Sequence, residues 1–75
     1  VDAKGPGYAN FVNRTTGEFY GWFRGRQTLV DQARRQLAAA RGTAVEWVFA
    51  EREAMQATQR LLQSEGITGI AMRVH

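Results

Sequence analysis

The residues best placed to do chemistry stand at the start of the chain, in Val1-Asp2-Ala3-Lys4. In an extended strand alternate side chains share a face, so Asp2 and Lys4 point the same way. A carboxylate there can hold a divalent cation. An ammonium one pleat away can position or activate a water, or neutralise charge developing on a phosphate. The spacing is typical of metal-dependent phosphodiester cleavage; the alternative is two opposite charges at a solvated strand end.

The next three residues, Gly5-Pro6-Gly7, predict where this strand ends. Proline has no amide hydrogen for a sheet, and glycine permits turn conformations. Asp2 and Lys4 are therefore expected at the carboxyl end of a strand, where open α/β sheets bind ligands.

Composition narrows the possible partners and metals. The 75 residues include ten Lys and Arg and seven Asp and Glu, which gives a net charge of +3. Every Lys or Arg except Lys4 is arginine. Arginine favours bidentate pairing with phosphate or carboxylate, so a polyanionic partner is plausible. The absence of cysteine excludes disulfides and Cys-based zinc sites, and the single His75 excludes a His-rich cluster. No apolar run is of membrane-spanning length, and no signal peptide opens the sequence.

Hydrophobic periodicity predicts the elements that position these groups. Apolar residues at helical spacing indicate a helix over 27–41 and a second one from about 51 to 64. β-branched and aromatic runs indicate strands over 44–50 and 67–74. The order strand, helix, strand, helix, strand predicts an α/β domain with a mainly parallel or mixed sheet flanked by helices. Between the first strand and first helix we expect a short helical turn at 8–12, a polar turn at 13–17 and an extended segment at 18–23.

Two glutamines and four arginines near the predicted first helix are candidate binding residues. Gln32 and Gln36 lie one helical turn apart beside the apolar stripe. They either border the core with local hydrogen bonds, or one reaches the site at the strand end. The arginines are candidates for contacts to a nucleic-acid backbone, with a plain solvated surface as the alternative: Arg24, Arg26, Arg34 and Arg35.

The run Asp2-Ala3-Lys4-Gly5-Pro6-Gly7-Tyr8-Ala9 resembles the [Asp/Glu]-x-Lys-Gly-Pro-Gly-Tyr block of the fifth restriction-endonuclease-fold toxin family. This family is known from polymorphic toxins and type VI secretion effectors. The resemblance continues through four further segments, 22–23, 32–40, 45–47 and 49–51. The combination covers nearly the whole chain and is far more specific than Asp-x-Lys alone.

The resemblance implies a PD-(D/E)xK fold and a metal-dependent DNase that uses Mg²⁺ or Mn²⁺. Such a toxin is secreted by a bacterium and delivered into the cytoplasm of a target cell. A cognate immunity protein neutralises it, and an effector chaperone is a further possible partner. Carried over to this sequence, Asp2 is the metal ligand, Lys4 the catalytic lysine, and Gln32 or Gln36 the helical glutamine of the site. Glu46 and Glu51 match acidic positions without an assigned role, and are expected to be a strand carboxylate and a helix-start charge.

The family pattern also has upstream strands that carry a first acidic ligand. We therefore expect residues 1–75 to be the C-terminal part of a toxin nuclease domain, inactive alone, since one carboxylate binds Mg²⁺ weakly. Two other readings remain. One is a non-catalytic interaction module gripped by an immunity protein or chaperone through the aromatics of 19–23. The other is a nucleic-acid-binding domain without catalysis.

Overall fold

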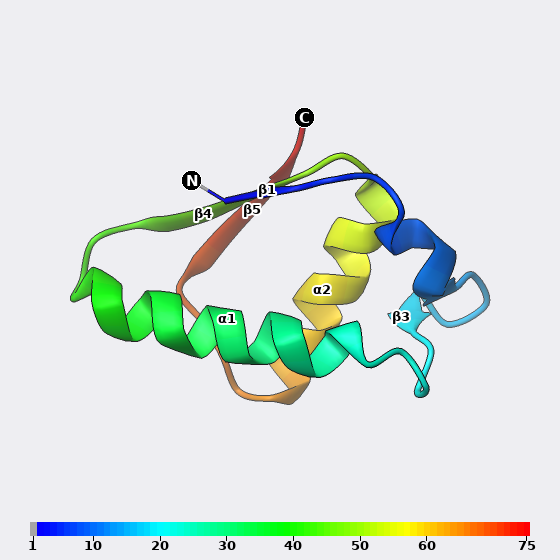
Figure 1. The fold of residues 1–75 in the computed structure, drawn as a ribbon, viewed down its shortest axis with the longest axis horizontal. Coiled ribbons are helices and arrows are strands. Elements are labelled where there is room, and N and C mark those ends of the chain that lie inside the picture. Colours follow the sequence, from blue (N-terminus) through cyan, green and yellow to red (C-terminus); the bar gives the residue numbers. More distant parts are fainter. Residues whose placement is uncertain (1) are drawn as a thin grey trace.

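The computed structural model describes residues 2–75, and of Asp2 it describes the backbone only. The elements along the chain are shown in Figure 1. They are β1 (Asp2–Lys4), the 3₁₀ helix η1 (Tyr8–Phe11), β2 (Val12–Asn13), β3 (Glu18–Phe19), α1 (Gly25–Ala40), β4 (Val45–Phe49), α2 (Arg52–Ser64) and β5 (Ile70–Val74). The predicted α/β class is confirmed. The hairpin of β2 and β3 is an addition to the expected order.

Three strands form one sheet in the order β1-β4-β5, and both pairs are parallel. We expected a mainly parallel or mixed sheet, and within residues 2–75 the first alternative holds, because antiparallel pairing occurs there only in the separate β2–β3 hairpin. The strands are parallel because helices connect them: α1 lies in the chain between β1 and β4, and α2 lies between β4 and β5. A helical crossover returns the chain to the same end of the sheet and so produces parallel neighbours.

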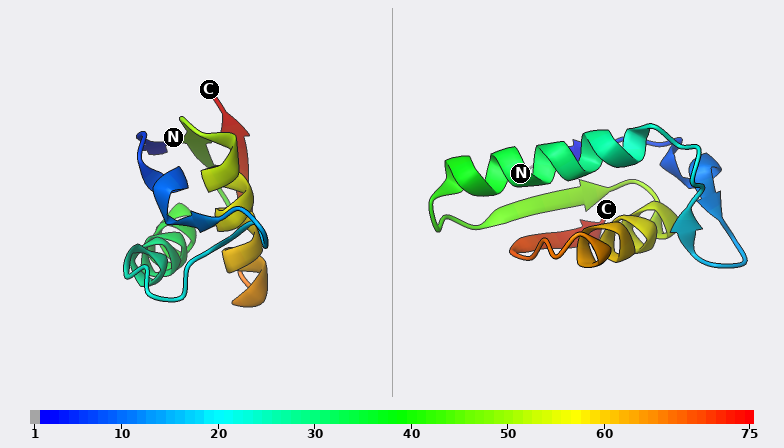
Figure 2. Two further views of the ribbon diagram at one scale, coloured as in Figure 1. Left: turned by 90° about the vertical axis from the view of Figure 1, so that its right-hand side faces the viewer. Right: turned by 90° about the horizontal axis from the view of Figure 1, so that it is seen from below.

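Both helices pack on the same face of this sheet, as Figures 1 and 2 show. On that face the side chains of Trp47 and Phe49 are fully buried against α1 and α2. The opposite face carries Ala3, Ala71 and Arg73, which are exposed. The sheet is thus covered on one side within the described part of the chain.

The two helices follow the predicted apolar stripes closely. In α1 the buried residues are Leu29, Val30 and Ala33, and in α2 they include Ala54 and Leu62. Neither these helices nor any other helix in residues 2–75 is long and apolar enough to cross a membrane.

Two predicted strands are shorter than expected. The final strand begins at Ile70 because Gly69 has a φ of +99°, which is incompatible with an extended strand. The aromatic segment 18–23 is extended only over Glu18–Phe19, and Phe23 N–H then donates to the Tyr20 carbonyl at 3.0 Å to close a turn. This turn brings the aromatic side chains into contact with one another instead of alternating them across a sheet.

Candidate active site

Lys4, at the carboxyl end of β1, is buried with only 5% of its surface exposed. Its Nζ donates a hydrogen bond to Gln32 Oε1 of α1 and lies 4.3 Å from the centroid of the Trp47 ring. A buried cation is costly unless polar or π-electron partners compensate for lost water. The amide oxygen and the indole face supply such partners, and they fix where the ammonium lies.

Trp47 joins the second predicted glutamine to the same cluster. This residue of β4 is fully buried, and its indole Nε1 donates to Gln36 Oε1 at 2.8 Å. Because Gln32 and Gln36 are one helical turn apart, both project from α1 toward the sheet. The structure therefore brings together Lys4, both glutamines and Trp47, and it distinguishes their contacts: Gln32 holds Lys4, and Gln36 holds Trp47.

Asp2 belongs to the same strand, and its Cα lies in register with Trp47. Strand alternation predicts that its carboxylate shares the face of Lys4, but this side chain lies outside the described residues. Its role as metal ligand remains a prediction.

The described residues do not by themselves form a metal site. Among residues whose side chains are described, no group of three or more His, Cys, Asp or Glu is arranged to hold an ion. The amide oxygens of Gln32 and Gln36 already accept hydrogen bonds from Lys4 and Trp47.

Glu51 controls the loop that follows Lys4. Its Oε1 accepts hydrogen bonds from the backbone N–H groups of Gly7 and Ala9, each at 3.0 Å. It stands at the N-terminus of α2, yet its side chain makes no cap to that helix. The expectation of a simple helix-start charge is therefore incomplete: this carboxylate ties the Gly-Pro-Gly loop and the start of η1 to the end of β4. The Ala50 N–H, donating to the Lys4 carbonyl at 3.0 Å, fastens the same two strand ends.

Glu46 lies away from this cluster. In β4 it alternates with Trp47 and so points to the opposite face of the sheet, where its Oε2 accepts a hydrogen bond from Arg73 Nε at 3.2 Å. The two side chains are 42% and 57% exposed. Glu46 is therefore a surface strand carboxylate in an ion pair.

The four candidate arginines all lie on α1 or directly before it. Arg24 and Arg26 are at the start of α1, where Arg26 is half-buried. Arg34 and Arg35 are exposed farther along the helix, and Arg34 pairs with Glu65 at 3.3 Å. Backbone contact to DNA through them remains a prediction.

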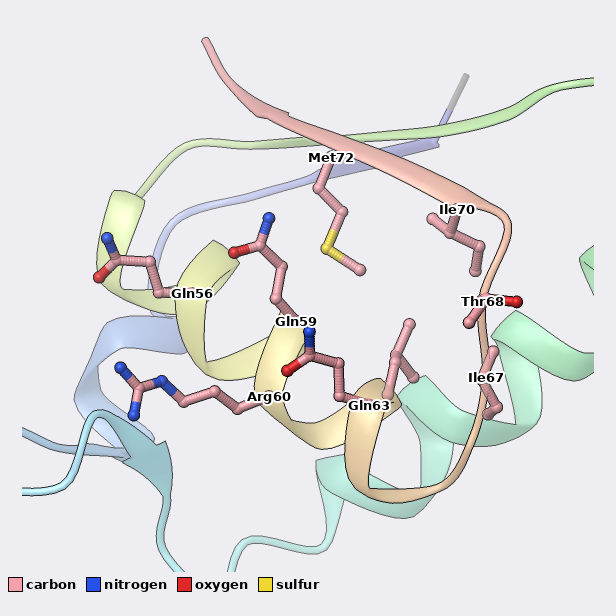
Figure 3. Close-up of a pocket in the computed structure, with 9 residues that line it drawn as sticks. Gln56, Gln59, Arg60, Gln63, Ile67, Thr68, Ile70 and Met72 are labelled. Atoms are coloured by element: carbon pink, nitrogen blue, oxygen red, sulfur yellow. The ribbon is translucent and has the colours of Figure 1, made fainter.

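A hollow of about 730 Å³ lies between α2 and β5 (Figure 3). Its lining includes Gln59, Gln63, Ile70 and Met72. It opens beside β5, whereas Lys4 lies on β1 at the other edge of the sheet. This hollow is therefore separate from the Lys4 cluster.

Sequence reasoning missed two contributors, Trp47 and Glu51. A buried tryptophan needs an acceptor for its N–H, and this requirement points from the strand 44–50 to a polar residue of the covering helix. Glu51 lies two residues beyond the end of β4, as Pro6 lies two residues beyond the end of β1, and parallel strands end at the same edge of a sheet. Both signals are present in the sequence, but they identify the partners of Trp47 and Glu51 only when the pairing of β1 with β4 is known.

Three comparisons with known proteins bear on this cluster. The family described as restriction endonuclease fold toxin 5 matches residues 1–52. This range includes Asp2, Lys4, both glutamines, Trp47 and Glu51. The search of curated proteins finds no match, and the search of solved structures also finds none. Since the match covers more than half of the 75 residues, the chain belongs to the restriction endonuclease fold toxin 5 family.

Proposed function

We propose that this chain carries the phosphodiester-cleaving centre of a DNase toxin. The observation that carries the proposal is the buried ammonium of Lys4, held at the carboxyl end of β1 by Gln32 and the Trp47 ring. A cation fixed in a position with little water interacts strongly with charge that develops on a nearby phosphate. Membership of a restriction-endonuclease-fold toxin family supports the same reaction class.

Each neighbour of Lys4 has a positioning task in this proposal. Gln32 accepts from the ammonium and sets its direction, while Trp47 orients Gln36 through the indole N–H. The hydrogen bond from Trp47 to Gln36 Oε1 fixes the orientation of the Gln36 amide group beside Lys4. Glu51 holds the loop that follows Lys4, which limits how far the end of β1 can move.

The resemblance adds a divalent ion, Mg²⁺ or Mn²⁺, with Asp2 as one ligand. When bound, such an ion would activate a water and neutralise phosphate charge. One carboxylate holds Mg²⁺ weakly, and the family pattern has a further acidic ligand upstream. We therefore propose that cleavage requires the intact toxin, and that the 75 residues alone are inactive. The positioning tasks of Gln32, Gln36 and Glu51 do not depend on the ion.

The biological setting is part of the same proposal. We expect delivery into the cytoplasm of a target bacterium, by a type VI or related secretion system, and neutralisation by a cognate immunity protein. An effector chaperone would accompany the toxin before delivery. The net charge of +3 is compatible with DNA as the substrate.

Production of the intact toxin in the cytoplasm of a bacterium tests this proposal. The wild-type toxin should degrade chromosomal DNA and arrest growth, and Lys4→Met should do neither. Arg73→Ala, on the uncovered face of the sheet, is the matched control and should remain toxic. Toxicity of Lys4→Met at equal protein levels, or growth arrest with intact chromosomal DNA, would contradict the proposal.

A further inference from the structure

Trp22 is the most exposed large hydrophobic residue in the described chain, with 66% of its surface accessible. Its ring stacks on Tyr20, with centroids 5.3 Å apart and planes 11° from parallel. Tyr20 is itself exposed. A pair of parallel rings open to solvent gains little from burial, so its placement points to a ligand that covers it.

The pair is mounted rigidly on the core. The Phe11 ring meets Trp22 edge-on at 5.8 Å and stacks on Phe23 at 4.3 Å, and Phe23 packs against buried Phe19 at 5.1 Å. The backbone reinforces this arrangement, because Tyr20 N–H donates to the Phe11 carbonyl at 2.8 Å. The rings are therefore held in place before any ligand arrives, which lowers the entropic cost of binding.

The charge beside the rings is positive. A hollow of about 240 Å³ is lined by Trp22, Arg24 and Arg26. Glu65 contributes a carboxylate to the same lining, but this carboxylate already pairs with Arg34 at 3.3 Å. Within residues 2–75, whose side chains are described from residue 3 onward, neither Arg24 nor Arg26 pairs with a carboxylate. Arginine beside exposed aromatic rings favours a ligand that is both anionic and planar.

The location connects these rings to the Lys4 cluster. Figure 1 shows η1, β3 and the start of α1 gathered at one end of the molecule. A second hollow, of about 420 Å³, is lined by Pro6, Gly7, Phe11 and Phe23, and so lies between the loop after Lys4 and the aromatic rings. Phe11, which lines this hollow, contacts the Trp22 ring, so the hollow extends from the loop after Lys4 toward the exposed ring pair.

We propose that Trp22 and Tyr20 form a stacking platform for an unpaired nucleobase, with Arg24 and Arg26 binding the adjoining phosphates. The inference rests on the proposed nuclease function and adds a substrate class: single-stranded DNA, or duplex DNA that is locally open. Bases in an intact duplex are stacked on one another and offer no free face to the platform. Each base stacked on an aromatic side chain changes affinity by about fivefold to a hundredfold.

The test is binding in EDTA, which separates recognition from cleavage. Labelled oligothymidylate of about 12 nucleotides is compared with an abasic oligonucleotide of equal length, which has the same phosphates and no bases. The intact toxin should bind oligothymidylate at least about fivefold more tightly than the abasic strand, and more tightly than a blunt duplex. Trp22→Ala should abolish this preference and leave abasic binding within about twofold, whereas Trp22→Phe should retain part of it.

Arg24→Ala is the complementary variant. It should weaken binding to both strands by the same factor and reduce the salt dependence, because it removes a phosphate contact. Circular dichroism of each variant checks that the fold is kept. The platform is overturned by any of three results: equal binding of both strands, no binding of either strand, or an unchanged preference in Trp22→Ala. Each of these results points to a protein as the partner that covers Trp22 and Tyr20. If the platform fails but Lys4-dependent cleavage is intact, the proposed nuclease function still holds. If base-dependent binding is intact but the toxin does not cleave DNA, the platform holds and the proposed nuclease function is wrong.

Discussion

The carboxylate of Glu51 holds the loop that follows Lys4, so replacing Glu51 tests how strongly this loop is fastened. Glu51 Oε1 accepts two backbone hydrogen bonds of 3.0 Å, from Gly7 and Ala9. A hydrogen bond to a charged group contributes about 1.5–3 kcal/mol. Two such bonds set an upper limit of about 3–6 kcal/mol. Glu51 is only half-buried, and solvent screening reduces this figure, so Glu51→Ala should lower the free energy of unfolding by about 2–4 kcal/mol.

Chemical denaturation followed by circular dichroism measures this loss. Glu51→Gln keeps an acceptor oxygen and loses the charge, so it should cost about 1–2 kcal/mol. Glu53→Ala is the matched control, because Glu53 is an exposed carboxylate on the first turn of the same helix. It should change stability by less than about 0.5 kcal/mol. If Glu51→Ala unfolded at the same denaturant concentration as Glu53→Ala, the claim that Glu51 fastens the loop would be refuted.

Three further predictions concern the other contacts of the sheet. Gln32→Leu should cost about 1.5–3 kcal/mol in denaturation, and Lys4→Met together with Gln32→Leu should recover most of this loss because both polar partners become apolar; a double variant no more stable than Gln32→Leu would contradict the pairing. Trp47→Phe should cost about 1–3 kcal/mol by leaving Gln36 Oε1 without its indole donor, and the loss should shrink in a Gln36→Met background if the hydrogen bond is its cause. Arg73→Ala should cost less than about 1 kcal/mol, since its pair with Glu46 is exposed; a larger loss would show that the uncovered face contributes more than surface ion pairs do.

The parts of the fold that follow from local pattern were predictable from the sequence. The apolar stripe of α1 includes Leu29, Val30 and Ala33, and all three are buried. The β-branched and aromatic run around Trp47 likewise forms β4. In such segments periodicity and tertiary burial agree, so the local signal is sufficient.

The aromatic segment was less predictable because its conformation depends on tertiary contacts. Phe19, Trp22 and Phe23 all have high strand propensity, yet the chain turns after Phe19 so that the rings pack on one another and on Phe11. Packing outweighs intrinsic strand preference here. No local pattern shows which neighbour a ring will choose.

For the candidate site, the sequence predicted which elements carry the named residues, but not the contacts between them. The spacing of Asp2, Lys4 and the two glutamines placed them on a strand and a helix. Which glutamine meets Lys4 depends on how α1 lies across the sheet, and this is a consequence of packing between distant segments. Glu51 illustrates the same limit, because its partners Gly7 and Ala9 are 44 and 42 residues away.

The most direct test of the account is supercoiled-plasmid cleavage by the intact toxin, with Mg²⁺ or Mn²⁺ and with EDTA. Wild type and the Arg73→Ala control are expected to cleave with metal and to stop in EDTA, and Lys4→Met is expected to be inactive while remaining folded. The isolated 75 residues, assayed in parallel, are expected not to cleave the plasmid. Cleavage by a folded Lys4→Met toxin at the wild-type rate would contradict the central claim that the buried ammonium of Lys4 acts on the phosphodiester.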